Sequence, residues 1–286
     1  WRGGAMSDGA EATLLARIGA NLTSADHDAR MDALLWAGAA AQAERQLALV
    51  SAGARPAFAA RLAMIKGTEG EAAVQAAPGS SEMRDAGWVY NRSKSMRAAN
   101  NTSGAIWLLA NRPPLSAPVR DQRKWLAEQL AVARKADANS AVQIAARIDE
   151  AFPAGTDISA LSYQIRDDYT SLMWLGGTRA LNTLGDGARA APLFWRYGAA
   201  ARTPQTRTKG FYWAGRAMAR AGNTAEANRY FEMAAAHPDH YYGMLALERL
   251  GRPMPALESS PGTAPTSAER EAFNDHPLTK AVREVA

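Results

Sequence analysis

The fold is decided by two stretches of the chain, WLGGTRALNTLGDGARAAPLF at 174–194 and FYWAGRAMARAGNTAEANRYF at 211–231. The second stretch repeats the pattern of the first at an offset of 37 positions, from 174 to 211. Each holds an aromatic residue, a glycine, an alanine and a second aromatic residue at the same spacing, pairing Trp174 with Phe211, Gly185 with Gly222, Ala190 with Ala227 and Phe194 with Phe231. A period of this length is typical of repeat proteins built from helical hairpins.

Each repeat predicts two helices joined by a tight turn. The first aromatic residue lies on the first helix, and the glycine takes the left-handed conformation that ends this helix. The alanine lies on the returning helix, where its small side chain allows two backbones to approach closely. In the second repeat, Asn223 and Glu226 resemble a capping box, and Pro238 stops the helix whose buried face is Ala227, Tyr230, Phe231 and Ala234.

This layout is that of a tetratricopeptide-like hairpin. Gly215 costs its helix about 1 kcal/mol relative to alanine, so it predicts close helix packing at that point. Stacked hairpins of this kind form a right-handed α–α superhelix. We therefore predict an all-α fold, with a superhelical domain over 1–252 and the other helices of the chain arranged in the same way.

Composition agrees with a helical fold. The 286 residues include 64 alanines but only 15 valines and isoleucines together, so sheet-forming side chains are scarce. The absence of cysteine excludes a disulfide framework and a thiolate metal site. A formal net charge of +5 is small for a nucleic-acid binder, and no apolar run is long enough to span a membrane. The sequence thus predicts no nucleic-acid partner, no transmembrane segment and no cofactor.

Helical patterns also occur upstream of the repeats. One helix carries Met31, Leu34, Leu35 and Gly38, with Ser24 and Asp26 as candidate N-caps, and a second begins near Ala57. The stretch after that second helix is punctuated by Gly67, Gly70 and the segment 77–81. Pro113 and Pro114 close a helix that carries Trp107, and Pro118 opens the next helix, which runs through Trp125.

The composition changes after Gly251. Residues 253–286 predict a connection rich in proline and serine, followed by the start of a helical linker domain in which Thr266 and Glu269 form a capping box. The last helix carries Leu278, Ala281, Val282 and Val285 and stops at Ala286 without a cap. Because the chain also begins at Trp1 rather than at methionine, we expect it to be a piece of a longer protein.

No constellation of catalytic or metal-binding residues stands out. His237 and His240 flank Pro238 and predict a turn rather than a metal site, and His27 and His276 are isolated. Asp167 and Asp168 are expected to stand at the N-terminus of the helix that carries Trp174, where their charges favour its dipole. Several aromatic residues could stack on sugars but are expected to be mostly core, namely Trp88, Tyr90, Trp107, Trp125, Tyr163, Trp195 and Tyr197.

Several segments are similar to one known family. They are YWAGRA at 212–217, AG at 221–222, AAAHP at 234–238 and YYGMLALERLG at 241–251, with RMDALLW at 30–36, DAG at 85–87 and the Asp168-Tyr169 helix upstream. Together they resemble the α-superhelical region of soluble lytic murein transglycosylases, over nearly the whole chain. The family usually has paired tryptophans where this chain has Lys124-Trp125, and Glu-Phe in place of Asp168-Tyr169, which suggests a divergent member.

The resemblance implies a periplasmic lyase that cleaves the β-1,4 bond between N-acetylmuramic acid and N-acetylglucosamine and leaves a 1,6-anhydro product. In that family one glutamate of a Glu-Ser pair, in a lysozyme-like domain after the superhelix, acts as acid and then as base. The Glu258-Ser259 pair of this chain lies in the proline-rich connection without the family's Gly-Leu-Met-Gln motif, so we interpret it as a coincidence.

We therefore expect a non-catalytic region, inactive alone, that positions peptidoglycan strands for a C-terminal lysozyme-like domain of the same parent chain. The alternative is a free-standing tetratricopeptide-like scaffold that binds a protein segment. No catalytic, cofactor or metal residue is assigned from the sequence.

Overall fold

The computed structural model describes residues 1–68, 80–255 and 264–285. Within these ranges it contains fifteen α-helices and no β-strand, so the prediction of an all-helical fold is confirmed. The chain divides into two compact units, Trp1–Arg252 and Pro253–Ala286. None of the described helices has the length and apolar content that crossing a bilayer requires.

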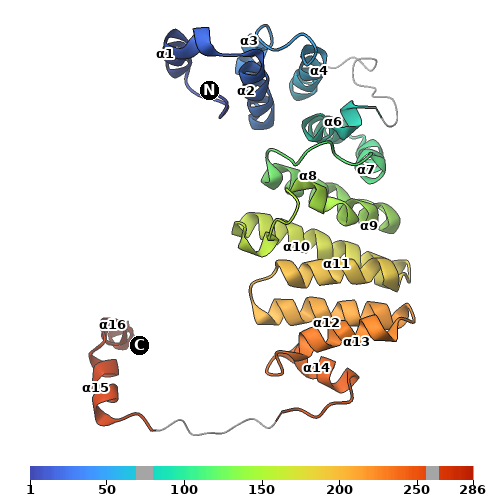
Figure 1. Cartoon of the computed structure of the whole chain (residues 1–286), viewed down its shortest axis with the longest axis vertical. Coiled ribbons are helices and arrows are strands. Elements are labelled where there is room, and N and C mark those ends of the chain that lie inside the picture. The colour runs from blue at the N-terminus through green and yellow to red at the C-terminus, as the bar shows by residue number, and fades with distance from the viewer. Residues whose placement is uncertain (69–79, 256–263, 286) are drawn as a thin grey trace. The chain divides into compact units, whose positions relative to one another are not determined.

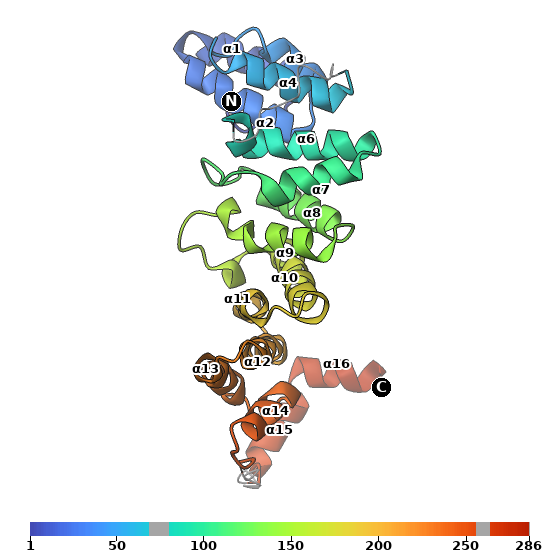
Figure 2. The same ribbon diagram turned by 90° about the vertical axis from the view of Figure 1, so that its right-hand side faces the viewer.

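The first unit holds thirteen of the described α-helices, which follow one another in chain order (Figures 1 and 2). They are α1 (Asp8–Ile18), α2 (Ser24–Ala37), α3 (Ala40–Gln46), α4 (Arg55–Lys66), α6 (Ala86–Ala98), α7 (Thr102–Asn111), α8 (Gln122–Ala133), α9 (Ala138–Ala146), α10 (Tyr163–Thr178), α11 (Gly187–Ala200), α12 (Pro204–Arg220), α13 (Thr224–Ala235) and α14 (Tyr241–Arg249). From α10 to α14, each helix packs on the next one in the chain. Figure 1 shows α10, α11, α12 and α13 running back and forth as antiparallel neighbours.

The hairpins expected from the repeat are present. Gly185 and Gly222 have φ angles of 69° and 78°, so both take the left-handed conformation that ends the first helix of each hairpin. The alanines at 190 and 227 are buried on the returning helices. A Cβ on Gly215 would stand 2.6 Å from the Phe231 ring, which confirms the close packing predicted there.

Two glycines from neighbouring hairpins bring α11 and α12 still closer. A Cβ placed on Gly210 would lie 2.5 Å from the backbone nitrogen of Gly198 and 2.7 Å from the carbonyl oxygen of Phe194. At the other end of this helix pair, a Cβ on Gly187 would meet the carbonyl oxygen of Ala217. The backbones of α11 and α12 therefore touch at both ends, which only glycine permits.

Three predicted helix starts differ from the structure, the first of them by only one residue at its nearer candidate. The N-cap of α2 is Thr23, whose hydroxyl accepts a hydrogen bond from the Asp26 N–H while the Asp26 carboxylate accepts one from the Thr23 N–H. Asp26 is thus the third helical residue of a capping box, and Ser24 is the first. Similarly, α8 starts not at Pro118 but at Gln122, because the Asp121 side chain caps the Lys124 N–H.

The third wrong start concerns Asp167 and Asp168, which lie inside α10 rather than before it. The helix begins at Tyr163 because its buried face extends upstream of the two aspartates, where Ile165 packs against the core. Burial, followed by the negative charge of Asp167, raises the pKa of Asp168 above its ordinary value.

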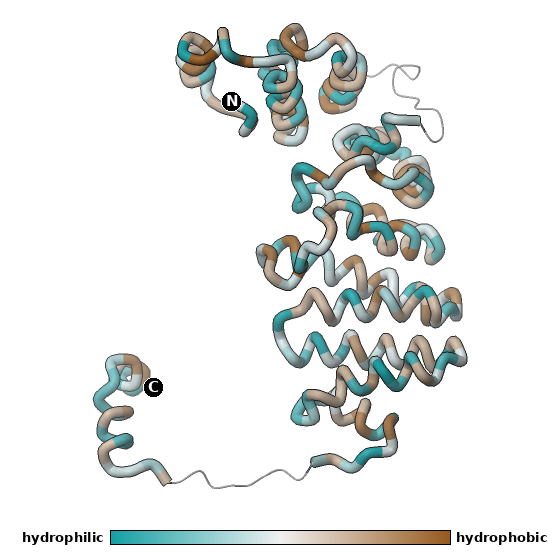
Figure 3. Tube along the Cα trace, viewed as in Figure 1, coloured by the Kyte–Doolittle hydropathy of each residue, from teal (hydrophilic) through white to brown (hydrophobic). Residues whose placement is uncertain are grey.

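Figure 3 shows polar and apolar residues mixed along the helices of the first unit. The largest buried cluster extends from Trp36 on α2 to Tyr230 on α13. Two smaller clusters lie around Leu34 and around Phe231. Burial is thus distributed over successive helix contacts along the unit.

The second unit contains α15 (Ser267–Asp275) and α16 (Pro277–Val285), neither of which has a buried residue. The capping box of Thr266 and Glu269 is confirmed, since each side chain accepts a hydrogen bond from the other residue's backbone N–H. Gly70, residues 77–79 and the Glu258-Ser259 pair lie outside the described residues.

Candidate functional site

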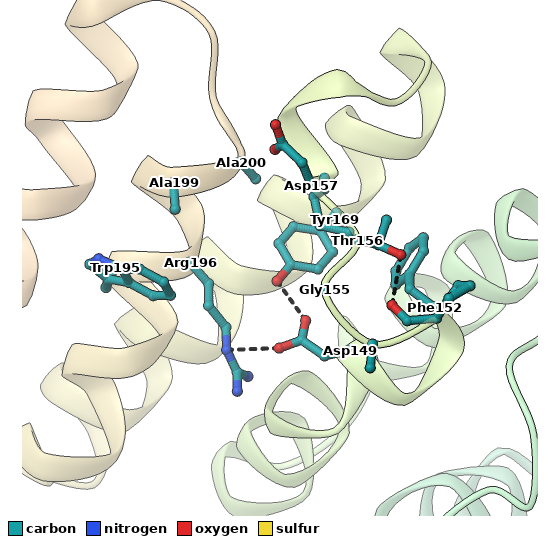
Figure 4. A pocket seen from close by; sticks show the side chains of 13 residues that line it. Asp149, Phe152, Gly155, Thr156, Asp157, Tyr169, Trp195, Arg196, Ala199 and Ala200 are labelled. Atoms are coloured by element: carbon teal, nitrogen blue, oxygen red, sulfur yellow. Dashed lines mark hydrogen bonds and ion pairs between the residues drawn. The ribbon is translucent and has the colours of Figure 1, made fainter.

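The candidate site is a cavity of about 350 Å³ between α11 and the segment that leads into α10 (Figure 4). Its walls are the 3-10 turn η3 (Ile148–Ala151), the loop after it, the start of the 3-10 turn η4 (Ile158–Ala160), and side chains of α10 and α11. The lining residues are Asp149, Phe152, Pro153, Ala154, Gly155, Thr156, Asp157, Ile158, Tyr169, Trp195, Arg196, Ala199 and Ala200. Polar, charged and aromatic side chains therefore meet in one open hollow.

The loop from 152 to 157 is held in shape by local hydrogen bonds. Gly155 has a φ of 79°, which allows the sharp reversal of the chain at this point. The Thr156 hydroxyl donates to the Pro153 carbonyl at 2.7 Å, and the Asp157 carboxylate accepts from the Ser159 N–H at 2.9 Å. The loop is therefore a preformed wall of the cavity.

A polar triad joins the three parts of the cavity. The Tyr169 hydroxyl donates to Asp149 Oδ1 at 2.7 Å, and Arg196 Nε lies 3.1 Å from Asp149 Oδ2. The guanidinium also donates to the Ala146 carbonyl at 3.0 Å. Burial, reinforced by the negative charge of Asp149, raises the pKa of Tyr169, so its phenol stays protonated and donates to the carboxylate. The Asp149 side chain remains about half exposed and is held in one orientation toward the cavity.

Trp195 is the aromatic side chain that the cavity presents to solvent. Its exposed fraction is 39%, although its neighbour Phe194 is fully buried. In the 37-residue repeat, Trp195 occupies the position of Glu232, which is also exposed. The second repeat thus has a charged residue where the first has a large aromatic one. This difference is a sequence feature that distinguishes Trp195 from core aromatic residues.

The expectation that the aromatic residues are mostly core is correct for some of them and wrong for others. Trp88, Tyr90 and Trp125 are buried. Trp107 and Tyr163 are exposed by 53% and 70%, and with Trp195 they contradict the expectation. Helical spacing alone failed here because Trp107 directly precedes the buried Leu108 and Trp195 directly follows the buried Phe194, and one step along a helix turns a side chain away from the buried face. Tyr197 is half-buried, with its ring 5.1 Å from that of Trp174.

The cavity carries groups that can bind a polar ligand. A glycosidase-like reaction needs a carboxylic acid that is protonated near neutral pH. The Asp157 carboxylate instead accepts hydrogen bonds from the Ser159 hydroxyl and from the Ser159 backbone N–H. These bonds, the hydroxyl's first in size, lower the pKa of Asp157. An exposed indole face, carboxylates that accept from hydroxyl groups and a fixed guanidinium are groups that recognise a polar ligand with an apolar face, such as a pyranose ring.

His237 and His240 lie in the turn between α13 and α14, as predicted, with ring centroids 6.0 Å apart. His240 Nδ1 lies 3.0 Å from a carboxylate oxygen of Asp239. In the part of the chain that the structure describes, no three histidine, aspartate or glutamate side chains are placed to hold a metal ion.

The chain was compared with protein-family models, with curated proteins and with solved structures, and no significant match was found in any of the three.

Proposed function

We propose that this chain is the non-catalytic helical region of a periplasmic peptidoglycan lytic transglycosylase, and that it holds glycan strands for a lysozyme-like domain of the same parent protein. The observation that supports the proposal is the exposed Trp195 indole beside the Asp149–Arg196 ion pair. The resemblance of the segments at 212–251 to that family points to the same polymer. The α11–α12 contact between hairpins is compatible with a continuing right-handed superhelix.

The chemistry of the cavity suits this ligand. A pyranose ring has a face of C–H groups that packs on an indole, and a rim of hydroxyl and acetamido groups that bond to carboxylates and guanidinium groups. The volume of about 350 Å³ is in the range of a small-molecule site and matches one or two sugar rings. A longer strand would continue along the surface of the unit.

Retention on purified sacculi tests the proposal. The full 286-residue chain is expected to co-sediment with sacculi, and Trp195→Ala should lower the apparent affinity about three- to tenfold because the stacking surface is lost. Trp107→Ala is the matched control, since Trp107 is also exposed but does not line this cavity. The chain alone should release no 1,6-anhydro-muropeptides.

Other results of the same experiment would contradict the proposal. If wild type is not retained, or if Trp107→Ala and Trp195→Ala weaken retention equally, this cavity is not a glycan site. A stoichiometric protein partner captured without any sacculus binding would favour the scaffold alternative.

A further inference from the structure

A second cavity, of about 360 Å³, gathers three arginines. Arg216 and Arg220 come from α12 and Arg249 from α14, and Trp213 forms part of the wall. The remaining lining residues are Leu181, Asn182, Ala219 and Phe231. We call the set Trp213, Arg216, Arg220 and Arg249 the arginine pocket.

The positive charges of this pocket are not neutralised within the described residues. Arg216, Arg220 and Arg249 have no carboxylate partner there, whereas the nearby Arg229 and Arg252 pair with glutamates at 2.8 and 2.5 Å. No carboxylate lines the cavity either. Three guanidinium groups around one hollow repel each other, so an anion that enters it gains attraction from all three.

Two of the three arginines contact the walls of the pocket. The Arg216 guanidinium carbon lies 5.0 Å from the Trp213 ring centroid, a cation–π contact. The Arg220 side chain reaches back to the turn at Gly185, where its Nη2 would lie 3.4 Å from an added Cβ. The indole Nε1 of Trp213 is buried without a hydrogen-bond partner in the described structure, which leaves one further donor unused.

The pocket continues along one face of α12. Lys209, Trp213, Arg216 and Arg220 have the spacing i, i+4, i+7 and i+11, which places them on the same side of the helix. The Lys209 ammonium lies 3.7 Å from the Trp174 ring centroid, and burial lowers its pKa. This face therefore carries three basic side chains and one aromatic side chain, which suits a ligand with both sugar rings and negative charges.

We propose that the arginine pocket binds a free carboxylate of the stem peptide of a muramyl-peptide strand. Guanidinium groups bind carboxylates through paired N–H donors, which gives direction as well as attraction. This assignment rests on the proposed function, and adds to it a second, charge-reading contact separate from the Trp195 cavity.

The test uses the full chain and two forms of muramyl dipeptide, one with its peptide carboxylate free and one with that carboxylate amidated. Calorimetric titration is expected to show tighter binding of the charged form. Arg216→Gln, Arg220→Gln and Arg249→Gln should each lower its affinity about tenfold, with little effect on the amidated form. Arg229→Gln removes the same charge from an arginine that already pairs with Glu226, so it is the matched control.

Each outcome has a definite meaning. Equal losses in Arg229→Gln and in the pocket variants, or no loss in any of them, overturn the arginine pocket. Inorganic phosphate that competes as well as the charged dipeptide overturns the assignment to carboxylates. If sacculi retain the three pocket variants as well as wild type but retain Trp195→Ala less well, the assignment of the arginine pocket is wrong and the proposed function stands. If wild type itself is not retained, the proposed function fails.

Discussion

The contact between α11 and α12 makes a quantitative prediction about Gly210→Ala. The new methyl carbon would stand 2.5, 2.6 and 2.7 Å from the nitrogen and Cα of Gly198 and the carbonyl oxygen of Phe194. Ordinary van der Waals contact begins near 3.4 Å, so the closest atom is about 0.9 Å too near. All three atoms belong to the backbone, so no side chain can rotate away and the two helices must separate.

The size of the effect follows from two opposing terms. Overpacking of this kind costs typically about 1–3 kcal/mol, and the upper end applies because backbone must move. Replacing glycine by alanine inside a helix returns up to about 1 kcal/mol. We therefore expect Gly210→Ala to reduce the free energy of unfolding by about 1–2 kcal/mol.

Urea denaturation followed by circular dichroism measures this change. Gly9→Ala is the matched control, because Gly9 lies in α1 with open space around it, and this variant should be as stable as wild type or slightly more so. If Gly210→Ala is as stable as Gly9→Ala, the two backbones are not in contact and the argument for close hairpin packing fails.

Two further predictions concern charged groups. Burial alone would raise the pKa of Glu150, but hydrogen bonds, led by the one from Arg112, hold this pKa below its ordinary value. The stabilisation that the Glu150 carboxylate gives is therefore complete above pH 4–5 and disappears as the pH falls further. Glu150→Gln should cost about 1–3 kcal/mol at pH 7 and much less at pH 3 in parallel urea titrations; an equal cost at both would refute the role of charge. Arg30 is fully buried and pairs with Glu11 of α1, a helix without buried residues, so Arg30→Met should speed tryptic cleavage at Arg17 severalfold while cleavage elsewhere stays unchanged. Uniformly faster cleavage would instead indicate global destabilisation.

The helical hairpins could be predicted because their determinants are local. A glycine at the end of a helix, a capping residue and a buried face at helical spacing lie within a few turns of each other, as at Gly222 and Asn223. The start of α10 was missed for the complementary reason. Its first turns carry polar residues, and Ile165 is recognised as part of the buried face only once neighbouring helices pack against it.

The two candidate sites depend on contacts between distant parts of the chain. Asp149 and Arg196 are 47 positions apart in sequence, from 149 to 196, and nothing local to either residue indicates that they pair. The arginine pocket likewise requires α14 to fold back on α12. For Trp195 a local indication did exist, since the repeat aligns it with the exposed Glu232.

Sequence alone thus determined that this protein is helical, where its repeated hairpins lie and which small residues allow them to pack, because backbone preference and helix periodicity act over short distances. Tertiary structure decided which aromatic residues face solvent, which charges are paired and which arginines share a cavity. Those properties depend on the rotation of each helix and on what packs against it, and both are set by burial summed over many distant contacts.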